Sequence, residues 1–351
     1  MRCRYAESGL YISANKRLSP CCSIFSHEDT IEFKNIEQTT DEYIRNFRTL
    51  NRQNLIQTHP VCKKQCIDVE RQGFISQRLR GQSVISHNRK NQKGIKRLDI
   101  SFSNTCNLDC VMCRPLYSSK WNNIAEKMPH SLQAGTGITS IKNKFMDYDT
   151  IDDIITKHGK TLESVVIKGG EVFYDKRAKY FLEKLADVNP DIKISITTNA
   201  TVLDFDLIKK FKKINLTCSV DGIHEIYEYI RGYDFKIVDD NVERLKNMEN
   251  VSLWIAVTVS YFNFHILPQT IKYFYQKGIK NVQVDSVREP WISPSLYPNK
   301  QFKRICKESP IRLKWKRQEL PNNMYEVHED YKKFWNEHRN MDWDTIDVSK
   351  Y

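Results

Sequence analysis

The sequence has no long hydrophobic run. Across its 351 residues, no unbroken apolar stretch approaches the 18 or so that a membrane-spanning helix needs. The first nine residues, Met1–Gly9, also lack the apolar centre of a signal peptide. We therefore expect a cytoplasmic protein without a membrane partner. Its 40% hydrophobic residues suffice for one large barrel and a small appended domain.

Acidic residues are missing from one stretch. Residues 71–97 contain eight Lys or Arg and no Asp or Glu, in a chain whose net charge is +12. A solvated linker is one interpretation, and a track for nucleic acid or another anionic substrate is the other. No recognisable nucleic-acid-binding module and no internal repeat accompany the stretch, so its charge does not choose between them.

Cysteine, by contrast, is plentiful. Ten cysteines in an intracellular chain indicate metal or redox chemistry rather than disulfides. Cys106, Cys110 and Cys113 are spaced x3 and then x2, one thiolate short of a closed four-ligand site. Three thiolates can hold three irons of a 4Fe–4S cube and leave the fourth iron open to a small chelating molecule. A zinc loop with a remote fourth ligand and three incidental cysteines are the alternatives.

The residues around these cysteines alternate between strand and helix patterns. Leu98, Ile100 and Phe102 alternate as in a half-buried strand just before the cysteine loop. Further strands are predicted at 164–167, 194–199, 216–222, 251–259 and 282–285. Helices are predicted around 151–155, 178–185, 204–211, 223–230, 238–245 and 268–277. Repeated βα units predict a parallel sheet.

Three further motifs follow the cysteine loop, each at a predicted strand. They are Gly169-Gly170-Glu171, Thr198-Asn199 and Ser219-Val-Asp221-Gly222. With these four motifs in this order, residues 96–300 resemble the radical S-adenosylmethionine enzymes. The resemblance implies an α/β fold, a partial (β/α)6 TIM barrel of the radical SAM type. A cysteine-rich module with a basic linker (1–95) would precede it, and a helical cap (301–351) would follow.

The resemblance also implies the chemistry. Cys106, Cys110 and Cys113 would be the catalytic metal ligands of a 4Fe–4S cluster whose open iron chelates S-adenosylmethionine. An electron from a reductant such as flavodoxin or ferredoxin would cleave the sulfonium, giving methionine and a 5′-deoxyadenosyl radical. That radical would remove a hydrogen from the substrate, as in a radical SAM oxidoreductase or maturase. The cofactor supplies this reactivity, and the protein supplies orientation and exclusion of water.

The same resemblance assigns residues to the methionine part of S-adenosylmethionine. Glu171 would bind its ammonium group, with Gly169 and Gly170 permitting close approach of the backbone. Ser219 and Arg231 would bind its carboxylate. A solvated turn carboxylate is the alternative for Glu171.

Other assignments concern the nucleoside. Thr198 and Asn199 would meet the ribose, or else make ordinary hydrogen bonds at a strand end. Met112 stands where many family members place an aromatic residue against adenine, and a thioether can pack there too. Asp221 is either a proton acceptor or a turn former. Val172 replaces a commoner proline after the Gly-Gly-Glu turn.

Five more cysteines precede the barrel. Residues 9–22 predict a β-hairpin that turns near Asn15-Lys16 and ends at Cys21 and Cys22, and Val61–Cys66 supplies two further thiols. This part resembles the SPASM and twitch modules, which hold auxiliary clusters, although those modules usually follow the barrel. The resemblance implies a second 4Fe–4S cluster on four cysteines, with Cys22 as an alternative to Cys21. These four are Cys3, Cys21, Cys62 and Cys66. A zinc knot is the other interpretation.

Two cysteines receive no role. Cys218 is interpreted as a buried small hydrophobic residue on a strand, and Cys306 as a helix residue.

Three functions of different classes remain. The first is a radical SAM enzyme acting on a peptide or protein side chain, with the auxiliary cluster relaying electrons. The second is radical modification of a nucleotide, nucleic acid or small metabolite, favoured by the basic charge. The third is a non-catalytic metal-binding scaffold, which predicts zinc and no cleavage of S-adenosylmethionine.

Overall fold

The computed structural model describes residues 3–14, 17–23, 31–32, 59–79, 95–313 and 315–350. These residues form two compact units that interleave along the chain. Unit 1 comprises residues 1–104, 144–196 and 204–214, and unit 2 comprises 105–143, 197–203 and 215–351. The predicted turn at Asn15-Lys16 and most of the basic stretch 71–97 lie outside the described residues.

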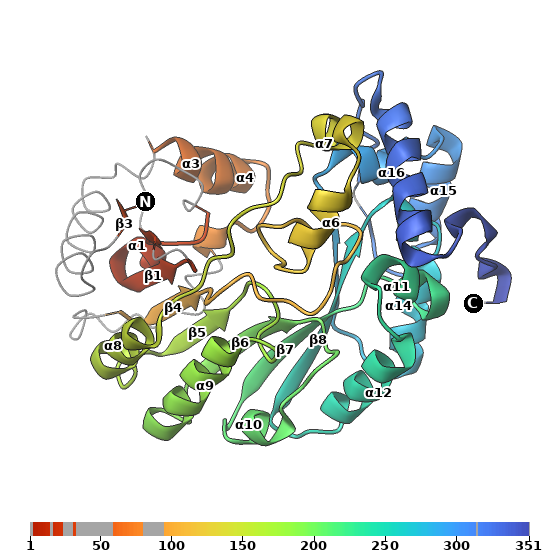
Figure 1. Cartoon of the computed structure of the whole chain (residues 1–351). Helices are drawn as coiled ribbons and strands as arrows, with labels where there is room; N and C mark the ends of the chain where they lie inside the picture. The colour runs from red at the N-terminus through yellow and green to blue at the C-terminus, as the bar shows by residue number, and fades with distance from the viewer. Residues whose placement is uncertain are drawn as a thin grey trace. The chain divides into compact units, whose positions relative to one another are not determined.

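Unit 1 contains a mainly parallel sheet (Figure 1). Its strands are β1 (Gly9–Ile12), β2 (Arg17–Ser19), β3 (Ile31–Glu32), β4 (Arg97–Ile100), β5 (Ser164–Ile167) and β6 (Lys193–Thr198, apart from its last two residues), in the order β3-β2-β1-β4-β5-β6. The antiparallel pairing of β1 with β2 confirms the predicted N-terminal hairpin. Strand β1 also pairs in parallel with β4, so the hairpin extends the sheet.

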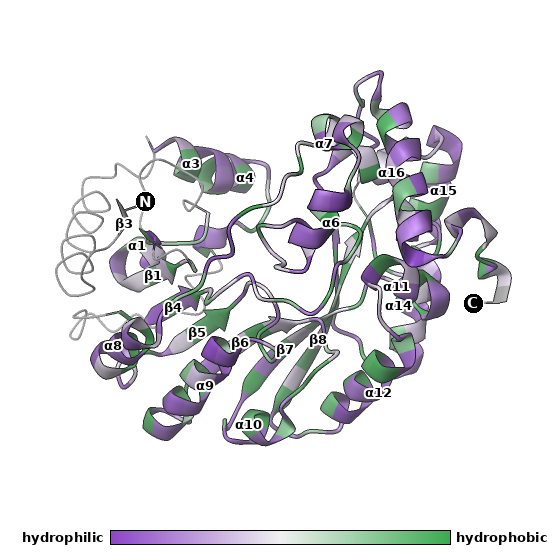
Figure 2. Cartoon of the chain, viewed as in Figure 1, coloured by the Kyte–Doolittle hydropathy of each residue, from purple (hydrophilic) through white to green (hydrophobic). Residues whose placement is uncertain are grey.

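Three of the helices described in unit 1 begin at an aspartate and bury one face. The described helices are α1 (Arg4–Ser8), α3 (Pro60–Cys62), the π-helical η2 (Lys63–Ile67), α4 (Asp68–Arg71), α8 (Tyr148–His158), α9 (Lys176–Val188) and α10 (Phe205–Lys209). The side chains of Asp147, Asp175 and Asp204 accept backbone N–H groups at the starts of α8, α9 and α10. Figure 2 shows β5 as hydrophobic and α9 with both kinds of residue, as expected for a buried strand beneath an amphipathic helix.

Unit 2 repeats the strand–helix alternation. Its strands are β7 (Ile214–Ser219, apart from its first residue), β8 (Val251–Val259) and β9 (Val282–Ser286), and β8 pairs in parallel with β9. Its α-helices are α6 (Trp121–Lys127), α7 (His130–Thr136), α11 (His224–Arg231), α12 (Phe235–Lys246), α13 (Tyr261–Phe264), α14 (Leu267–Gln276), α15 (Asn299–Glu308) and α16 (Met324–Arg339). Short 3₁₀ turns follow β9 and end the chain: η3 (Pro290–Ile292), η4 (Pro294–Leu296), η5 (Trp343–Thr345) and η6 (Val348–Lys350).

The predicted α/β fold with parallel βα units, a partial barrel, is confirmed. Helix α11 ends at Gly232 and α14 just before Gly278, and both glycines have positive φ, 66° and 80°. Strand β4 ends at Ile100, two residues earlier than predicted, and Ser103 forms a separate antiparallel bridge with Phe145. Helices α6 and α7 were not predicted. No helix in the described part of the chain is long and apolar enough to cross a membrane.

Candidate active site

The three-cysteine loop belongs to unit 2. Cys110 is buried, and Cys106 and Cys113 are half-buried. The pKa of Cys113 is raised, and burial is the largest cause. Negative charge on Cys110 and Cys106 raises that pKa further. Burial also raises the pKa of Cys110, whereas the positive charge of Arg231 lowers it. The three thiols are therefore close enough to interact electrostatically, beside a cation that favours thiolate.

The sulfur of Cys106 has two N–H groups near it. The backbone N–H of Leu108 lies 3.5 Å from this sulfur, and the side-chain amide of Asn199 lies 3.9 Å from it. Asn199 also donates to Asn107 (2.9 Å) and accepts from Thr201 (2.7 Å from its hydroxyl). This network ties the loop to the end of β6, and hydrogen bonds to ligand sulfurs are one way in which proteins tune iron–sulfur clusters.

Arg231 lies at the end of α11 and forms an ion pair with Asp221. The distance from Arg231 Nη2 to Asp221 Oδ2 is 2.5 Å, and Asp221 is 0% exposed. Asp221 also accepts the backbone N–H of Thr258 (2.6 Å), so it anchors β8 as well as the arginine. Among the described residues, the buried Nε of Arg231 and the hydroxyl of Tyr227 have no hydrogen-bond partner.

The other predicted nucleoside and methionine contacts of unit 2 are at strand ends. Thr198 is buried, and its hydroxyl accepts the N–H of Ala200 (3.0 Å), which matches the interpretation as a strand-end hydrogen bond. Ser219 is the last residue of β7 and is half-buried, as is Met112 in the cysteine loop. Cys218 is fully buried, as predicted.

Unit 1 contains the Gly-Gly-Glu turn. Gly169 and Gly170 have φ values of 96° and 49°. A side chain on Gly169 would collide with the hydroxyl of Ser101 and come within 3.2 Å of the carbonyl oxygen of Ser103. Glu171 is 1% exposed, and its carboxylate accepts the N–H of Phe173 (3.2 Å). Burial argues against the alternative of a solvated turn carboxylate.

The N-terminal cysteines also lie in unit 1, and their charges act on one another. Burial raises the pKa of Cys62 to about 12, with further contributions from Cys3 and Cys66. The pKa of Cys21 is raised well above its usual value by burial and then by Cys22, Cys3 and Cys62. Charge interactions thus link the predicted set, while Cys62 and Cys66 stand four residues apart on one helical segment.

Cys22 has different surroundings. Burial raises its pKa, and the next contributions come from Lys168 and Asp99. The amide of Gln77 lies 4.0 Å from its sulfur. Beyond burial, the pKa of Cys22 therefore responds mainly to charged residues, whereas that of Cys21 responds to Cys22, Cys3 and Cys62.

Single-ion metal sites can be compared with cluster sites by the geometry that each requires. Within the described ranges, no group of three or more His, Cys, Asp or Glu side chains could hold one metal ion. A zinc ion would need all of its sulfur ligands about 2.3 Å from one centre, whereas each cysteine of a 4Fe–4S cube binds its own iron.

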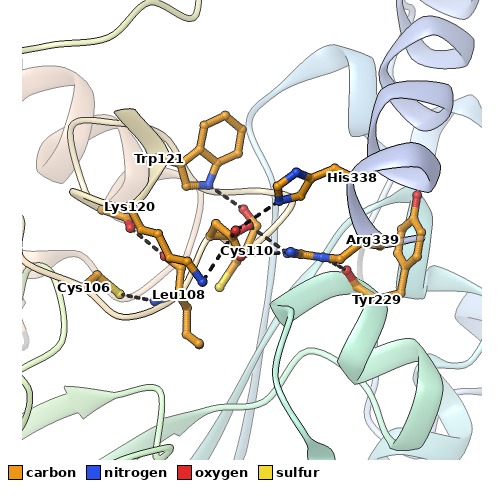
Figure 3. Close-up of polar contacts among 10 residues, drawn as sticks. Cys106, Leu108, Cys110, Lys120, Trp121, Tyr229, His338 and Arg339 are labelled. Atoms are coloured by element: carbon orange, nitrogen blue, oxygen red, sulfur yellow. Dashed lines mark hydrogen bonds and ion pairs between the residues drawn. The ribbon is translucent and has the colours of Figure 1, made fainter. Parts of the chain in front are cut away.

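Sequence reasoning missed a group of side chains that hold the cysteine loop. Arg339, His338 and Lys120 all approach the carboxylate of Asp109, the residue before Cys110. Figure 3 shows these three side chains around Cys110. Trp121 donates its indole N–H to the carbonyl of Cys110 (2.8 Å). Only the position of Asp109 inside the cysteine motif could have pointed to this group, since His338 and Arg339 are more than 200 residues away.

The chain combines a mainly parallel sheet with a loop of three cysteines that follows strand β4. This arrangement is typical of a barrel that binds an iron–sulfur cluster. Residues 100–274 match the Radical SAM superfamily, and this chain therefore contains a Radical SAM superfamily domain. Membership implies an enzyme that uses a 4Fe–4S cluster and S-adenosylmethionine.

Individual proteins with similarity to the chain include one curated relative and two solved structures. An uncharacterized protein of Methanocaldococcus jannaschii, MJ0907, is 25% identical over 210 residues, 56% of this chain and 64% of that protein. The structure of native anSMEcpe with bound AdoMet has 24% identity and a TM-score of 0.42, covering 56% of this chain and 53% of that one. Streptococcus suis SuiB bound to S-adenosylmethionine has 13% identity and a TM-score of 0.42, covering 90% and 56%. This chain thus spans less than two thirds of each.

Proposed function

We propose that the chain is a radical SAM enzyme that acts on a peptide or protein side chain. Its single strongest support is the loop of Cys106, Cys110 and Cys113, whose thiols interact with one another inside the Radical SAM domain. When bound there, a 4Fe–4S cluster and S-adenosylmethionine supply a 5′-deoxyadenosyl radical, which abstracts hydrogen from the substrate. Residues of the chain would bind and orient S-adenosylmethionine.

In this proposal, unit 2 orients the carboxylate and nucleoside of S-adenosylmethionine. Arg231 offers its unpartnered Nε to the carboxylate while Asp221 holds the rest of the guanidinium in place. Ser219 is the second carboxylate contact, Thr198 meets the ribose, and Met112 packs against the adenine. Asn199 meets the ribose in the sequence-based assignment, and its amide near the Cys106 sulfur adds a role in stabilising that ligand.

Unit 1 supplies the ammonium contact. Glu171 is buried and accepts the N–H of Phe173, and a buried carboxylate is stabilised further by a cationic partner. The methionine ammonium would be such a partner, with Gly169 and Gly170 keeping the turn free of side chains.

An auxiliary 4Fe–4S cluster is the second part of the proposal. Cys3, Cys21, Cys62 and Cys66 would be its ligands, in a module of the SPASM/twitch kind. The mutual charge interactions of these thiols support the set, and the separate surroundings of Cys22 favour Cys21. A fully ligated cluster would relay an electron from the substrate radical, and flavodoxin or ferredoxin would be the external reductant.

The central experiment measures iron, sulfide and zinc after anaerobic reconstitution, and 5′-deoxyadenosine after addition of dithionite and S-adenosylmethionine. We expect about eight irons per chain. A Cys106/Cys110/Cys113 triple-alanine variant should retain about four and produce no 5′-deoxyadenosine. Cys306→Ala, at a half-buried helical cysteine, is the matched control and should behave like the parent.

Other results would change the proposal. About four irons in the parent would retain the enzyme and remove the auxiliary cluster. Zinc without cleavage would replace the enzyme by a metal-binding scaffold. Nucleic acid that co-purifies and dissociates with salt would favour the nucleotide or nucleic-acid substrate over a peptide.

Two single variants test the ligand choice. Cys21→Ser should lose the auxiliary iron, because it removes a thiol from the interacting set. Cys22→Ser should keep it. The reverse pattern in iron content would show that the alternative ligand is the real one.

A further inference from the structure

The three-cysteine loop is irregular, yet its backbone is fixed at four consecutive carbonyl groups. Residues 104–120 contain no helix or strand. Each carbonyl oxygen of residues 108–111 accepts a hydrogen bond from a side chain. The donors, in order, are Ser118 Oγ (2.6 Å), Arg339 Nη2 (2.9 Å), Trp121 Nε1 (2.8 Å) and Tyr331 Oη (2.6 Å). Side-chain donors thus take the place of the backbone N–H groups that would bond to these carbonyls in a helix or sheet.

Two of these four donors come from α16, more than 200 residues along the chain. Arg339 also donates to the Asp109 carboxylate (Nη1 to Oδ1, 2.9 Å) and to the carbonyl of Tyr229 (Nε, 2.9 Å). His338 lies with Nε2 3.2 Å from the other Asp109 oxygen. Figure 3 shows His338 and Arg339 reaching the loop from the same helix. We call Tyr331, His338 and Arg339 the α16 clamp.

The surroundings of Arg339 are shaped to admit it. Gly232 ends α11 with a φ of 66°, and a Cβ there would lie 2.6 Å from the guanidinium carbon. The guanidinium of Arg339 also lies over the ring of Trp335, with 4.7 Å between Cζ and the ring centroid. The side chain of Arg339 is only 9% exposed, so its charge is compensated mainly by Asp109. A nearly buried guanidinium that donates from several nitrogens fixes the orientation of the loop backbone as well as its distance from α16.

We propose that the α16 clamp holds the loop of Cys106, Cys110 and Cys113 in the shape that receives the iron–sulfur cluster, with Arg339 and Tyr331 as positioning residues. The inference rests on the proposed function for the identity of the cluster. The donors Ser118 and Trp121 are local and move with the loop, whereas the clamp and the backbone bond from Val111 to Ile230 (2.8 Å) connect it to distant elements. Neighbouring groups that orient metal ligands commonly change affinity or activity 10- to 100-fold.

The first test needs no cluster. Hydrogen exchange is followed over residues 106–116 in the full chain before reconstitution, for Arg339→Met, Tyr331→Phe and the exposed same-helix control Lys333→Met. We expect the loop amides to exchange about tenfold faster in the first two variants and at the parental rate in the control. The exchange rate of β8 should be unchanged in all three variants. Arg339→Lys, which keeps the charge but not the fork, should restore part of the protection.

The second test uses the reconstituted chain. Arg339→Met should alter the electron paramagnetic resonance spectrum of the reduced cluster with S-adenosylmethionine bound and raise KM for that molecule about tenfold or more. Equal acceleration of exchange in the loop and β8, or parental exchange in the loop, would overturn the clamp. Faster loop exchange with a parental spectrum and KM would overturn the positioning role. A parent chain without iron would instead refute the proposed function, while the exchange comparison still decides whether α16 fixes the loop.

Discussion

Arg231 and Asp221 form a buried ion pair, with 2.5 Å between Nη2 and Oδ2 and relative exposures of 8% and 0%. Burial raises the pKa of Asp221, and the positive charge of Arg231 acts in the opposite direction. The pair joins the end of α11 to the start of the loop after β7. It therefore connects fold stability to a residue proposed to bind S-adenosylmethionine.

Asp221→Asn should destabilise the chain strongly. The substitution keeps the shape of the side chain but leaves the Arg231 charge buried without compensation, which costs about 3–5 kcal/mol. Urea unfolding followed by circular dichroism measures the loss. Asp240→Asn, in the exposed pair with Lys236 (2.7 Å), is the control and should show no measurable change. Equal unfolding midpoints for both variants would contradict the importance of the buried pair.

Asn199→Ala should make the reduction potential of the cluster at Cys106 more negative. The amide near the Cys106 sulfur favours the reduced, more negatively charged cluster, and its loss removes that stabilisation. Cleavage of S-adenosylmethionine should fall about tenfold. Thr201→Val disturbs the same network but retains the amide, so its potential should stay near that of the parent. Identical potentials, measured by redox titration, in all three proteins would exclude a tuning role.

Gly169→Ala should destabilise the folded chain more than Gly278→Ala does. Both glycines have positive φ, so each alanine introduces backbone strain of about 1–2 kcal/mol. Only the Cβ at 169 would also meet other atoms, those of Ser101 and Ser103, whereas nothing lies within 4 Å at 278. Thermal unfolding of the two variants compares them, and the difference isolates the close contact at the Gly-Gly-Glu turn. A larger loss at 278 would mean that the turn tolerates a side chain.

Stability should depend on His265 at mildly acidic pH. Burial lowers its pKa from 6.5 to about 4, and its Nδ1 lies 3.2 Å from the Tyr297 hydroxyl. Between these two pKa values the unfolded chain binds more protons at this residue, so folding stability falls as pH decreases from 6.5 towards 4. The loss is about 2 kcal/mol after allowance for partial exposure.

The matched variant is His265→Gln. The free energy of urea unfolding, measured before reconstitution at pH 7 and 4.5, should fall less in this variant than in the parent. His328, whose pKa burial also lowers, is present in both chains and does not affect the difference. Parallel pH profiles would assign the acid sensitivity to other groups.

Local chemistry explains which parts of the fold could be predicted. Helix α9 has apolar residues at helical spacing, and Gly232 supplies the left-handed conformation that ends α11. Both signals are contained in a few neighbouring residues. Helices α6 and α7 are only seven residues each, and the prediction missed them, although Trp121, Ile124 and Ala125 of α6 keep helical spacing.

The site divides in the same way. The spacing of the three cysteines and the order of the motifs indicated the domain that the family comparison finds. The approach of Arg339 to Asp109 and the different surroundings of Cys21 and Cys22 depend on residues far apart in the chain. No local pattern encodes such contacts. The roles of the individual site residues stay predictions.

The parallel pairing of β1 with β4 affects how the N-terminal region can be studied. Gly9, Leu10, Tyr11 and Ile12 cover the edge of the strand that leads into the cysteine loop. A shortened chain beginning at residue 96 would expose those backbone groups, and an uncovered edge next to a buried apolar strand promotes aggregation. The auxiliary cysteines are therefore better removed by substitution than by deletion, since an insoluble truncation would mimic the loss of a cluster.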